Sequence, residues 1–164
     1  MSVFDIVLAR RSIRNYENKP IPRDILDKII EAGRQSPSAA NRQPYRFVIV
    51  TDPETRKQMK GLLSRFLEKA PAIIVGCANT KAPLTGKWAP IDTTIALQTM
   101  VLTAWSLGIG SCWIGSFNEQ KIKQLLNIPE DWTIIALVTL GYPKENPKPR
   151  TKKPTNELFS YNQF

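Results

Sequence analysis

Three arginines and a serine lie within five residues near the start of the chain, as Arg10, Arg11, Ser12 and Arg14. A guanidinium group presents a planar, permanently charged set of donors that matches the oxygens of a phosphate. The Ser12 hydroxyl adds a donor for a phosphate or sugar oxygen. In an extended segment, Arg10, Ser12 and Arg14 share one face. This pattern predicts a site for a phosphate-bearing cofactor, and the alternative is a solvated basic segment at the negative end of a helix.

A second group of cations follows residue 143, and it comprises Lys144, Lys148, Arg150, Lys152 and Lys153. The whole chain has 23 basic and 14 acidic residues, which gives a net charge of +9. Such a charge attracts nucleic acid, anionic surfaces or phosphorylated small molecules. Aromatic residues do not alternate with the basic clusters as a stacking platform for nucleic acid requires. A small phosphate ligand is therefore favoured, a basic nucleic-acid-binding module is the rival, and a solvated end is the alternative for the tail.

Several catalytic chemistries are excluded by composition. The chain has no histidine, which removes histidine general bases, catalytic triads that use histidine, and histidine metal ligands. Its two cysteines, Cys77 and Cys112, lie in apolar runs and are predicted to be buried free thiols rather than a disulfide. Two isolated cysteines do not form a zinc or iron–sulfur site. If the protein is an enzyme, a group other than histidine or a metal carries the chemistry.

The elements that must position these residues fit one domain, because 164 residues are too few for two ordinary ones. Periodicity and breakers predict helices over residues 2–9, 24–34, 52–67, 90–107 and 118–126, and strands over 45–50, 72–78, 110–115 and 132–140. The pattern indicates an α+β or α/β protein with a four-stranded sheet flanked by helices. The helix over 90–107 is apolar nearly all round, so it is expected in the core or across a subunit interface.

Two loops complete the candidate site. Residues 37–44 form a loop of small and polar residues bounded by prolines, and an ordinary polar loop is the alternative. Gly108, Gly110 and Gly115 allow the backbone to approach a flat ring closely, or alternatively serve caps and tight turns. No apolar run reaches the roughly 18 residues of a membrane span, and no signal peptide is evident. We therefore expect a cytoplasmic protein.

Five short motifs, in order, carry a resemblance to a known family. They are Arg10–Arg14, Pro37–Pro44, Leu107–Gly115, Leu140–Pro143 and Lys148–Arg150. Their order and spacing over essentially the whole chain resemble the nitroreductase family of flavoproteins. The resemblance implies a nitroreductase-like α+β fold (an α/β sandwich) with a central, mainly antiparallel sheet of four to five strands. It also implies a homodimer with active sites at the subunit interface, in which residues 1–164 form one domain and the tail, 143–164, wraps on the partner or the cofactor.

The resemblance also implies FMN as cofactor and assigns the residues around it. The segment at the phosphate, ribityl chain and pyrimidine edge comprises Arg10, Arg11, Ser12 and Arg14. The loop that comes from the other subunit contributes Pro37, Ser38, Ala39, Asn41 and Gln43. The residues against the isoalloxazine ring are Ile114 and Gly115. The residues that return to the phosphate from the tail are Lys148 and Arg150.

The activity implied is reduction of nitro compounds, quinones or related electron-poor molecules by NADH or NADPH, in a ping-pong reaction through FMN. No side chain is required as nucleophile or general base, because a flavin carries hydride and electrons itself, and Arg14 is expected to tune its potential. No metal, nucleic acid or membrane is implied. The alternatives are a dedicated flavin chemistry on the same fold, either flavin fragmentation or reductive dehalogenation, and a flavin-storing or regulatory protein without turnover.

Overall fold

The fold is given by a computed structural model, which describes residues 2–59, 61 and 65–164. Its sheet has four strands, β1 (Tyr45–Val50), β2 (Ala72–Ala78), β3 (Gly110–Ile114) and β4 (Thr133–Gly141). Their order is β1-β2-β4-β3, and every pairing between these strands is antiparallel. The predicted α+β fold and its antiparallel sheet are therefore confirmed, and β3 is left as an edge strand.

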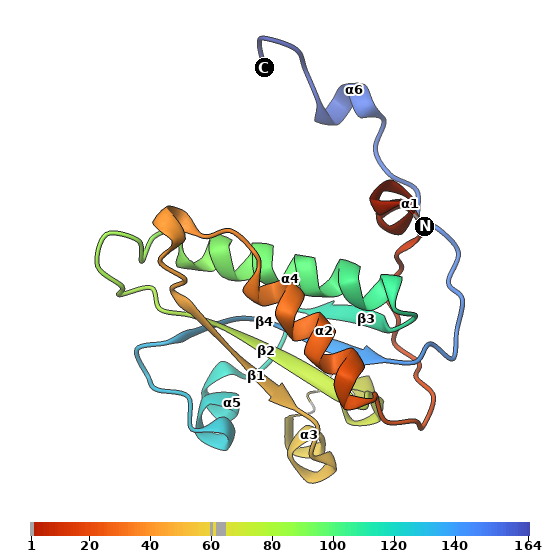
Figure 1. The fold of residues 1–164 in the computed structure, drawn as a ribbon, viewed down its shortest axis with the longest axis vertical. Helices are drawn as coiled ribbons and strands as arrows, with labels where there is room; N and C mark the ends of the chain where they lie inside the picture. Colours follow the sequence, from red (N-terminus) through yellow and green to blue (C-terminus); the bar gives the residue numbers. More distant parts are fainter. Residues whose placement is uncertain (1, 60, 62–64) are drawn as a thin grey trace.

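The helices lie on both faces of this sheet (Figure 1). The helices α2 (Arg23–Arg34) and α4 (Ala89–Ser106) cover one face, and α3 (Pro53–Met59) and α5 (Glu119–Leu126) cover the other. The remaining elements are α1 (Val3–Ala9), α6 (Thr155–Leu158) in the tail, and the short 3-10 turns η1 (Ala39–Asn41) and η2 (Arg65–Lys69). One apolar cluster fills the space between the sheet and the α2–α4 pair, and it includes Ile29, Ile74, Leu97 and Met100. A second cluster, which includes Leu67, Val75 and Ile122, lies under α3 and α5. The sheet is thus covered on both faces.

Close packing of α4 explains why this helix is so apolar. A Cβ atom at Gly33 of α2 would lie 2.1 Å from the Met100 Cε atom, and one at Gly76 of β2 would lie 2.7 Å from Leu97 Cδ1. Glycine at these two positions lets α2 and β2 approach α4 from different sides. The exposed side chains of α4 include two isoleucines, Ile91 and Ile95, so this helix has an apolar face towards solvent as well.

Local signals place most helix ends as the sequence predicts. The Ser2 hydroxyl accepts from the Asp5 amide and the Asp5 carboxylate accepts from the Ser2 amide, which forms a capping box for α1. The Asn118 side chain accepts from the Lys121 amide, as predicted for the start of α5. Gly108 follows α4 with φ of 77°, the left-handed conformation expected of a capping glycine.

The predicted helix over residues 52–67 is wrong as one element. The helix ends at Met59, Gly61 is not helical, and the chain resumes in η2. Glycine weakens a helix interior by about 1 kcal/mol relative to alanine. The Arg56 guanidinium also donates to the carbonyl oxygens of Glu68 and Ala70, which draws η2 back against α3. Leu62 and Leu63, placed on the apolar side of that helix by the prediction, lie outside the described residues.

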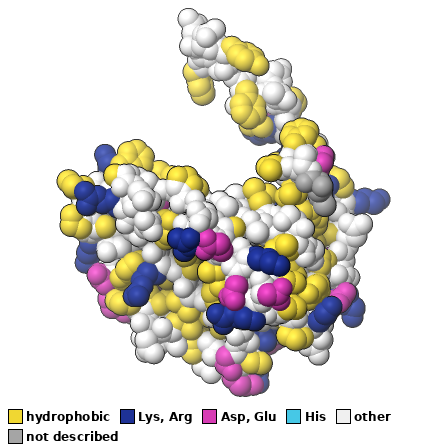
Figure 2. All heavy atoms as spheres, in the orientation of Figure 1, with side chains coloured by type: hydrophobic (Ala, Val, Ile, Leu, Met, Phe, Trp, Pro, Cys, Tyr) yellow, Lys and Arg dark blue, Asp and Glu magenta, His cyan; other side chains and the backbone are white. Residues whose placement is uncertain are grey.

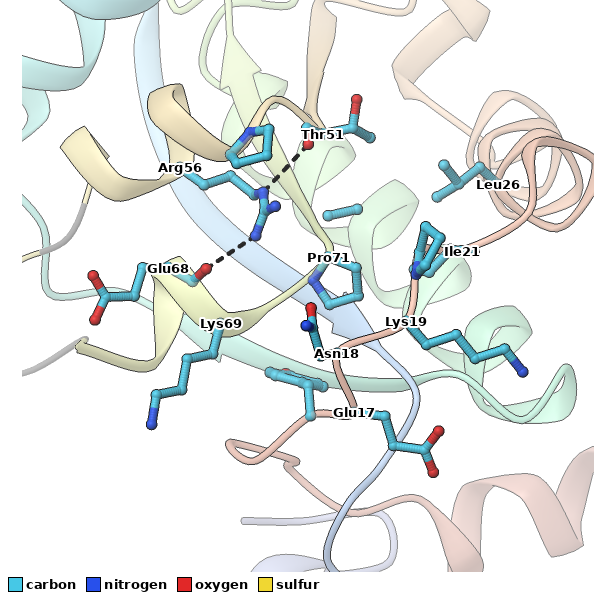
Figure 3. Close-up of a pocket in the computed structure, with 14 residues that line it drawn as sticks. Glu17, Asn18, Lys19, Ile21, Leu26, Thr51, Arg56, Glu68, Lys69 and Pro71 are labelled. Atoms are coloured by element: carbon cyan, nitrogen blue, oxygen red, sulfur yellow. Dashed lines mark hydrogen bonds between the residues drawn. The ribbon is translucent and has the colours of Figure 1, made fainter.

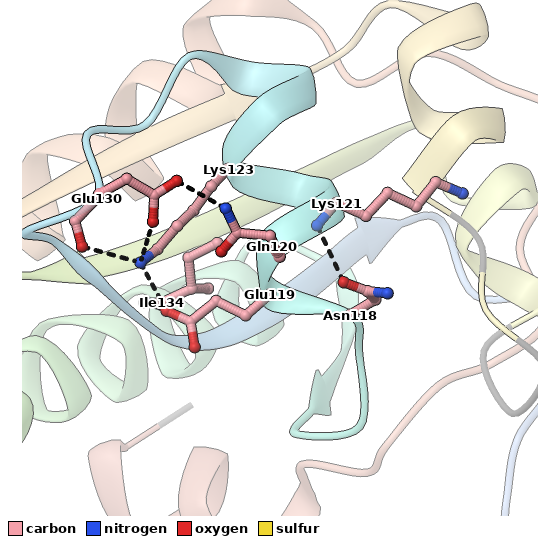
Figure 4. Close-up of polar contacts among 7 residues, drawn as sticks. All are labelled: Asn118, Glu119, Gln120, Lys121, Lys123, Glu130 and Ile134. Carbon is pink, nitrogen blue, oxygen red and sulfur yellow. Dashed lines mark hydrogen bonds and ion pairs between the residues drawn. The ribbon is translucent and has the colours of Figure 1, made fainter.

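A buried lysine fixes α5 to the end of β4 (Figure 4). Lys123 is 8% exposed, and its Nζ atom lies 3.4 Å from Glu119 Oε1 and 3.2 Å from the Glu130 carbonyl oxygen. The same Glu119 oxygen accepts a hydrogen bond of 2.9 Å from the Ile134 amide. These contacts hold the segment that follows β3 in place.

The chain ends in a tail that leaves the body of the protein (Figure 1). Residues 148–164 are exposed throughout, and α6 is the short helix within them. No helix among the described residues has the length and apolarity that crossing a bilayer requires. Within that same part of the chain, no three Cys, Asp or Glu side chains gather as a metal ion would need.

Candidate cofactor site

The basic segment lies along the free edge of β3. Ser12 forms a parallel bridge with Ser111, and the Ile13 amide donates to the Ser111 carbonyl oxygen over 2.8 Å. The Ile13 side chain is fully buried, whereas Arg14 is exposed and Arg10 and Ser12 are partly buried. The predicted extended conformation is thus confirmed at Ser12. The buried Ile13 side chain anchors the segment, and the residues on either side of it lie on the solvent side.

A buried hydroxyl pair supports this segment from below. The Tyr16 hydroxyl donates to the Ile13 carbonyl oxygen over 2.5 Å and lies 2.7 Å from the Thr139 Oγ1 atom. Thr139 in turn donates to the Cys112 carbonyl oxygen over 3.3 Å. Burial raises the pKa of Tyr16 well above its usual value, so this hydroxyl stays protonated and able to donate. The segment is therefore hydrogen-bonded to both β3 and β4.

The arginines divide between two roles. The Arg11 guanidinium donates to the carbonyl oxygens of Leu8, at 2.7 Å, and Arg10, at 2.9 Å. It therefore lies at the negative end of α1, where the helix-dipole alternative places an arginine. Arg10 and Arg14 both act on the Cys112 thiol, because their charges partly oppose the rise in its pKa that burial causes. Arg10 and Arg14 flank the Ser12 bridge to β3, and their convergence on a phosphate stays a prediction.

The base of the tail pairs with the basic segment. Pro143 bridges Tyr16, the Glu17 amide donates to the Tyr142 carbonyl oxygen over 2.9 Å, and the Lys144 amide donates to the Asn15 carbonyl oxygen over 3.0 Å. Glu145 completes this pairing, because its Oε1 atom accepts from the amides of Arg14, at 2.5 Å, and Asn15, at 3.0 Å. The two ends of the chain therefore meet at the edge of the sheet.

The tail residues that were assigned to the phosphate lie just beyond this pairing. Lys148 and Arg150 are both exposed, three and five positions after Glu145. Their return to the phosphate stays a prediction.

The end of β3 offers an open stretch of backbone. The Ile114 side chain packs into the cluster under α5 and is 6% exposed. A Cβ atom at Gly115 would meet no atom within 4 Å, so space lies above the backbone there. Gly115 follows Ser111 by four positions, which corresponds to about 13 Å along an extended chain. The cations and the hydroxyl of the basic segment and the open backbone at Gly115 thus lie along one edge strand, and their chemistry fits the phosphate, the ribityl chain and the flat ring of FMN.

The second predicted half of the site lies at the far end of α4 (Figure 1). The Ala39 amide donates to both carboxylate oxygens of Asp92, at 3.2 Å each, near the start of α4. Within the loop, Ser38 Oγ accepts from the Gln43 amide at 3.0 Å, and Gln43 Nε2 donates to the Asn41 carbonyl oxygen at 3.0 Å. The 18 residues of α4 span about 27 Å. Pro37 begins this same exposed loop.

A single chain therefore does not bring the two predicted halves together. Arg10, Ser12, Arg14, Ile114 and Gly115 share the β3 edge, and the residues of the 37–43 loop lie at the opposite end of α4.

The cleft in Figure 3 is not part of this site. It measures about 600 Å³ and lies between the segment from Tyr16 to Ile21, the end of β1 and η2, and none of the predicted cofactor residues lines it. Its lining carries both signs of charge, including Glu17, Lys19 and Lys69. The partly buried Arg56 guanidinium donates to the Thr51 carbonyl oxygen at 3.4 Å as well as to the η2 segment, so this cation has a structural role.

Sequence reasoning missed three residues that organise the site. Tyr16 and Glu145 act through partners that lie more than 100 positions away along the chain, and no local pattern indicates those pairs. Asp92 did have a signal, because it is a single acidic residue in an otherwise apolar helix. A buried carboxylate needs a donor, so this position predicts a contact with another segment.

Comparison with known proteins agrees with this geometry. The profile of the nitroreductase family matches residues 7–82 and 58–142. A candidate NADH dehydrogenase/NAD(P)H nitroreductase of Methanothermobacter thermautotrophicus is 34% identical over 157 residues, which cover 92% of this chain and 82% of that protein. The crystal structure of a nitroreductase family protein from Clostridium novyi NT superposes with a TM-score of 0.80 at 34% identity, covering 92% of this chain and 89% of that one.

A further similar structure was solved with a bound nucleotide. The NADPH:FMN oxidoreductase of Vibrio harveyi, solved in complex with NAD+, superposes with a TM-score of 0.89 at 28% identity, covering 99% of this chain and 77% of that one. The similarity extends over the sheet, the helices on both faces and the segments at each end of α4. On the matched profile and the relatives at 34% identity, the chain belongs to the nitroreductase family.

Proposed function

We propose that this protein is a homodimeric, FMN-dependent oxidoreductase that takes electrons from NADH or NADPH and delivers them to nitro compounds, quinones or related electron-poor small molecules. The observation that carries the proposal is the juxtaposition at the edge of β3, where Arg10, Ser12 and Arg14 lie beside an open backbone at Gly115. The similarity to an NADPH:FMN oxidoreductase supports the cofactor and the electron donor.

Each residue at that edge has a role that follows from its chemistry. Arg10 and Ser12, with Lys148 and Arg150 from the tail, bind the FMN phosphate through charge-assisted and hydroxyl hydrogen bonds. Arg14 follows in the same segment, with its amide held by Glu145, and its guanidinium group is assigned to the pyrimidine edge of the ring. Its positive charge there favours the anionic reduced form of a flavin.

The backbone at Ile114 and Gly115 supports the ring. When bound, FMN supplies the hydride and electron transfer, so no side chain needs to act as an acid or base.

A second copy of the chain completes the site. The 37–43 loop of one protomer faces the β3 edge of the other, because the two halves lie at opposite ends of α4 within one chain. Apolar side chains that are exposed in the single chain supply the contact: Val3 and Phe4 of α1 are 74% and 68% exposed, and Ile91 of α4 is 50% exposed. None of the seven residues of α1 is buried, which is unfavourable for an apolar helix unless a partner covers it.

The tail adds a second set of exposed apolar groups, Leu158, Phe159, Tyr161 and Phe164. Figure 2 shows hydrophobic side chains on a segment that projects beyond the body of the protein. In the proposed dimer the tail wraps over the partner and buries them. Removal of residues 151–164 is then expected to weaken the dimer, and sedimentation velocity at several protein concentrations measures this. A full-length protein that sediments as a monomer at micromolar concentration would overturn the dimer.

The central test is the absorbance of the purified protein. We expect visible flavin bands that bleach on addition of NADH or NADPH under nitrogen and return when a quinone or nitroaromatic acceptor is added. Parallel lines in initial-rate plots identify the ping-pong order, and intersecting lines reject it. Arg14→Gln is expected to weaken FMN binding, whereas Arg46→Gln, an exposed arginine on β1, serves as the matched control. A colourless protein that binds no added FMN would remove the proposal.

The other flavin chemistries give different products in the same experiment. A dehalogenase releases halide from a halogenated phenol, and a flavin-fragmenting enzyme consumes reduced FMN and oxygen with loss of the flavin spectrum. A storage protein retains oxidised FMN in the presence of NADH and NADPH. The buried free thiols Cys77 and Cys112 fit a reducing compartment, and a cytoplasmic location is part of the proposal.

A further inference from the structure

We propose that Asp92 is the positioning residue of the cofactor-facing loop, and that its buried carboxylate holds residues 37–43 in the shape that receives the flavin bound by the partner subunit. The inference rests on the proposed function, because the loop has a flavin to receive only if that function holds.

The loop has a shape that its residues do not adopt readily by themselves. Ala40, Asn41 and Gln43 have φ angles of 50°, 53° and 52°. The left-handed region is unfavourable for residues with a Cβ atom, and asparagine tolerates it better than alanine or glutamine. Such conformations persist where surrounding contacts over-determine them, and they cluster at ligand sites. The loop therefore needs an anchor outside itself.

Contacts within the loop do not provide that anchor. The Ser38 hydroxyl accepts from the Gln43 amide, and the Gln43 side chain bonds to the Asn41 carbonyl oxygen, so both contacts join residues that move together. The contact of the Ala39 amide with Asp92 differs, because it joins the loop to the 18-residue helix α4. Both oxygens of the carboxylate lie 3.2 Å from that amide nitrogen, which places the donor between them.

The burial of Asp92 points to the same role. Its side chain is 4% exposed, and an ionised carboxylate is unfavourable in such a place unless a donor compensates it. The next residue, Thr93, is also buried, but its hydroxyl donates to the Ala89 carbonyl oxygen within the helix at 2.7 Å. The two adjacent buried polar residues thus make different contacts: Thr93 bonds within α4, and Asp92 bonds to the loop.

The experiment compares variants of these two residues in the full-length protein. Asp92→Ala removes the acceptor, Asp92→Asn keeps an acceptor oxygen at the same place, and Thr93→Val removes a buried hydroxyl that does not touch the loop. Two readouts are taken, with and without added FMN. One is the rate of trypsin cleavage after Arg42, an exposed residue of the loop, relative to cleavage after Lys152, an exposed tail residue outside the predicted site. The other is the Kd for FMN from quenching of flavin fluorescence.

Asp92→Ala is expected to raise relative cleavage after Arg42 at least about fivefold, because the loop opens locally. Its Kd for FMN is expected to rise about tenfold, equivalent to about 1.4 kcal/mol. Asp92→Asn restores both values to within about threefold of the wild type, since an acceptor for the Ala39 amide remains. Thr93→Val leaves both values unchanged. If Asp92→Ala does not fold, Ala39→Pro removes the donor instead, and the extended conformation of Ser38 suits a following proline.

The inference would be overturned if Asp92→Ala, or Ala39→Pro in its place, showed the wild-type cleavage ratio and the wild-type Kd. Equal losses in Asp92→Ala and Thr93→Val would also overturn it, because they would show general destabilisation of α4. Faster cleavage with an unchanged Kd would mean that the loop does not face the flavin. A wild-type protein that binds no FMN contradicts the proposed function instead, and the cleavage ratio without FMN still decides whether Asp92 holds the loop.

Discussion

Replacement of Gly110 by alanine is expected to push the basic segment off the edge of the sheet. A Cβ atom at this position would lie 2.7 Å from Ile13 Cγ1, 2.9 Å from Ile13 Cβ and 3.0 Å from Pro143 Cγ. Ordinary contacts begin at 3.4 Å, so Ile13 must retreat by about 0.5 Å or more. Its Cβ atom cannot move by side-chain rotation, so the backbone on either side of it, including Ser12 and Arg14, must shift with it.

The magnitude follows from overpacking in a rigid environment. Extra methyl groups in packed interiors destabilise proteins by about 1–3 kcal/mol. Here the Ile13 amide is held by Ser111 and its carbonyl oxygen by Tyr16, which opposes relaxation. For a chain of this size, a loss of about 2 kcal/mol lowers the melting temperature by roughly 4–8 °C. The displaced arginines are also expected to weaken FMN binding about tenfold.

The assay pairs thermal unfolding of the FMN-free protein with fluorescence titration of FMN. Two glycines supply controls that separate the effects. Gly108 has φ of 77° and open space around it, so Gly108→Ala destabilises the protein by about 1 kcal/mol through the backbone and leaves FMN binding intact. Gly115→Ala meets no atom, so it keeps stability but obstructs the ring. The reasoning fails if Gly110→Ala binds FMN as tightly as Gly108→Ala does.

Three further predictions concern buried polar groups, and urea unfolding tests each of them. Tyr16→Phe removes the hydroxyl that donates to the Ile13 carbonyl oxygen and leaves Thr139 with Cys112 as its partner, so it should destabilise the protein by about 1–2 kcal/mol; an unchanged midpoint contradicts this. Burial raises the pKa of Cys77 to about 11, so the thiol ionises at a lower pH in the unfolded chain than in the folded protein. The free energy of unfolding should therefore fall between about pH 9 and 11. Cys77→Ala should make this fall with pH less steep, and an equally steep fall in both proteins rejects the argument. The free energy of unfolding of Lys123→Met should stay within about 1 kcal/mol of the wild-type value, whereas Lys123→Ala should be less stable, because methionine fills the space of the buried aliphatic part of the lysine side chain. Equal losses of stability in the two variants would refute this.

The parts of the fold that the sequence predicts well depend on neighbouring residues. The capping box of Ser2 and Asp5, the Asn118 cap and the glycine after α4 are encoded within four positions of the helix ends that they define. The strands were recognisable because β2 and β4 are continuous apolar runs. The helix over 52–67 failed because an arginine that looks like an ordinary surface residue, Arg56, bonds to carbonyl groups of a later segment.

The sequence by itself determined most of the helices and all four strands, the cations that are available, and the histidine-based chemistries that are excluded. Only the tertiary structure decided which residues meet. The order β1-β2-β4-β3 leaves β3 at an edge, where Ser12 pairs with Ser111 and where Arg14 and Glu145 come together although 131 positions separate them. The same packing holds the 37–43 loop at the opposite end of α4 through Asp92. Local preferences act over a few residues, whereas these contacts depend on strand order and on burial of one shared core, and a single stretch of sequence specifies neither.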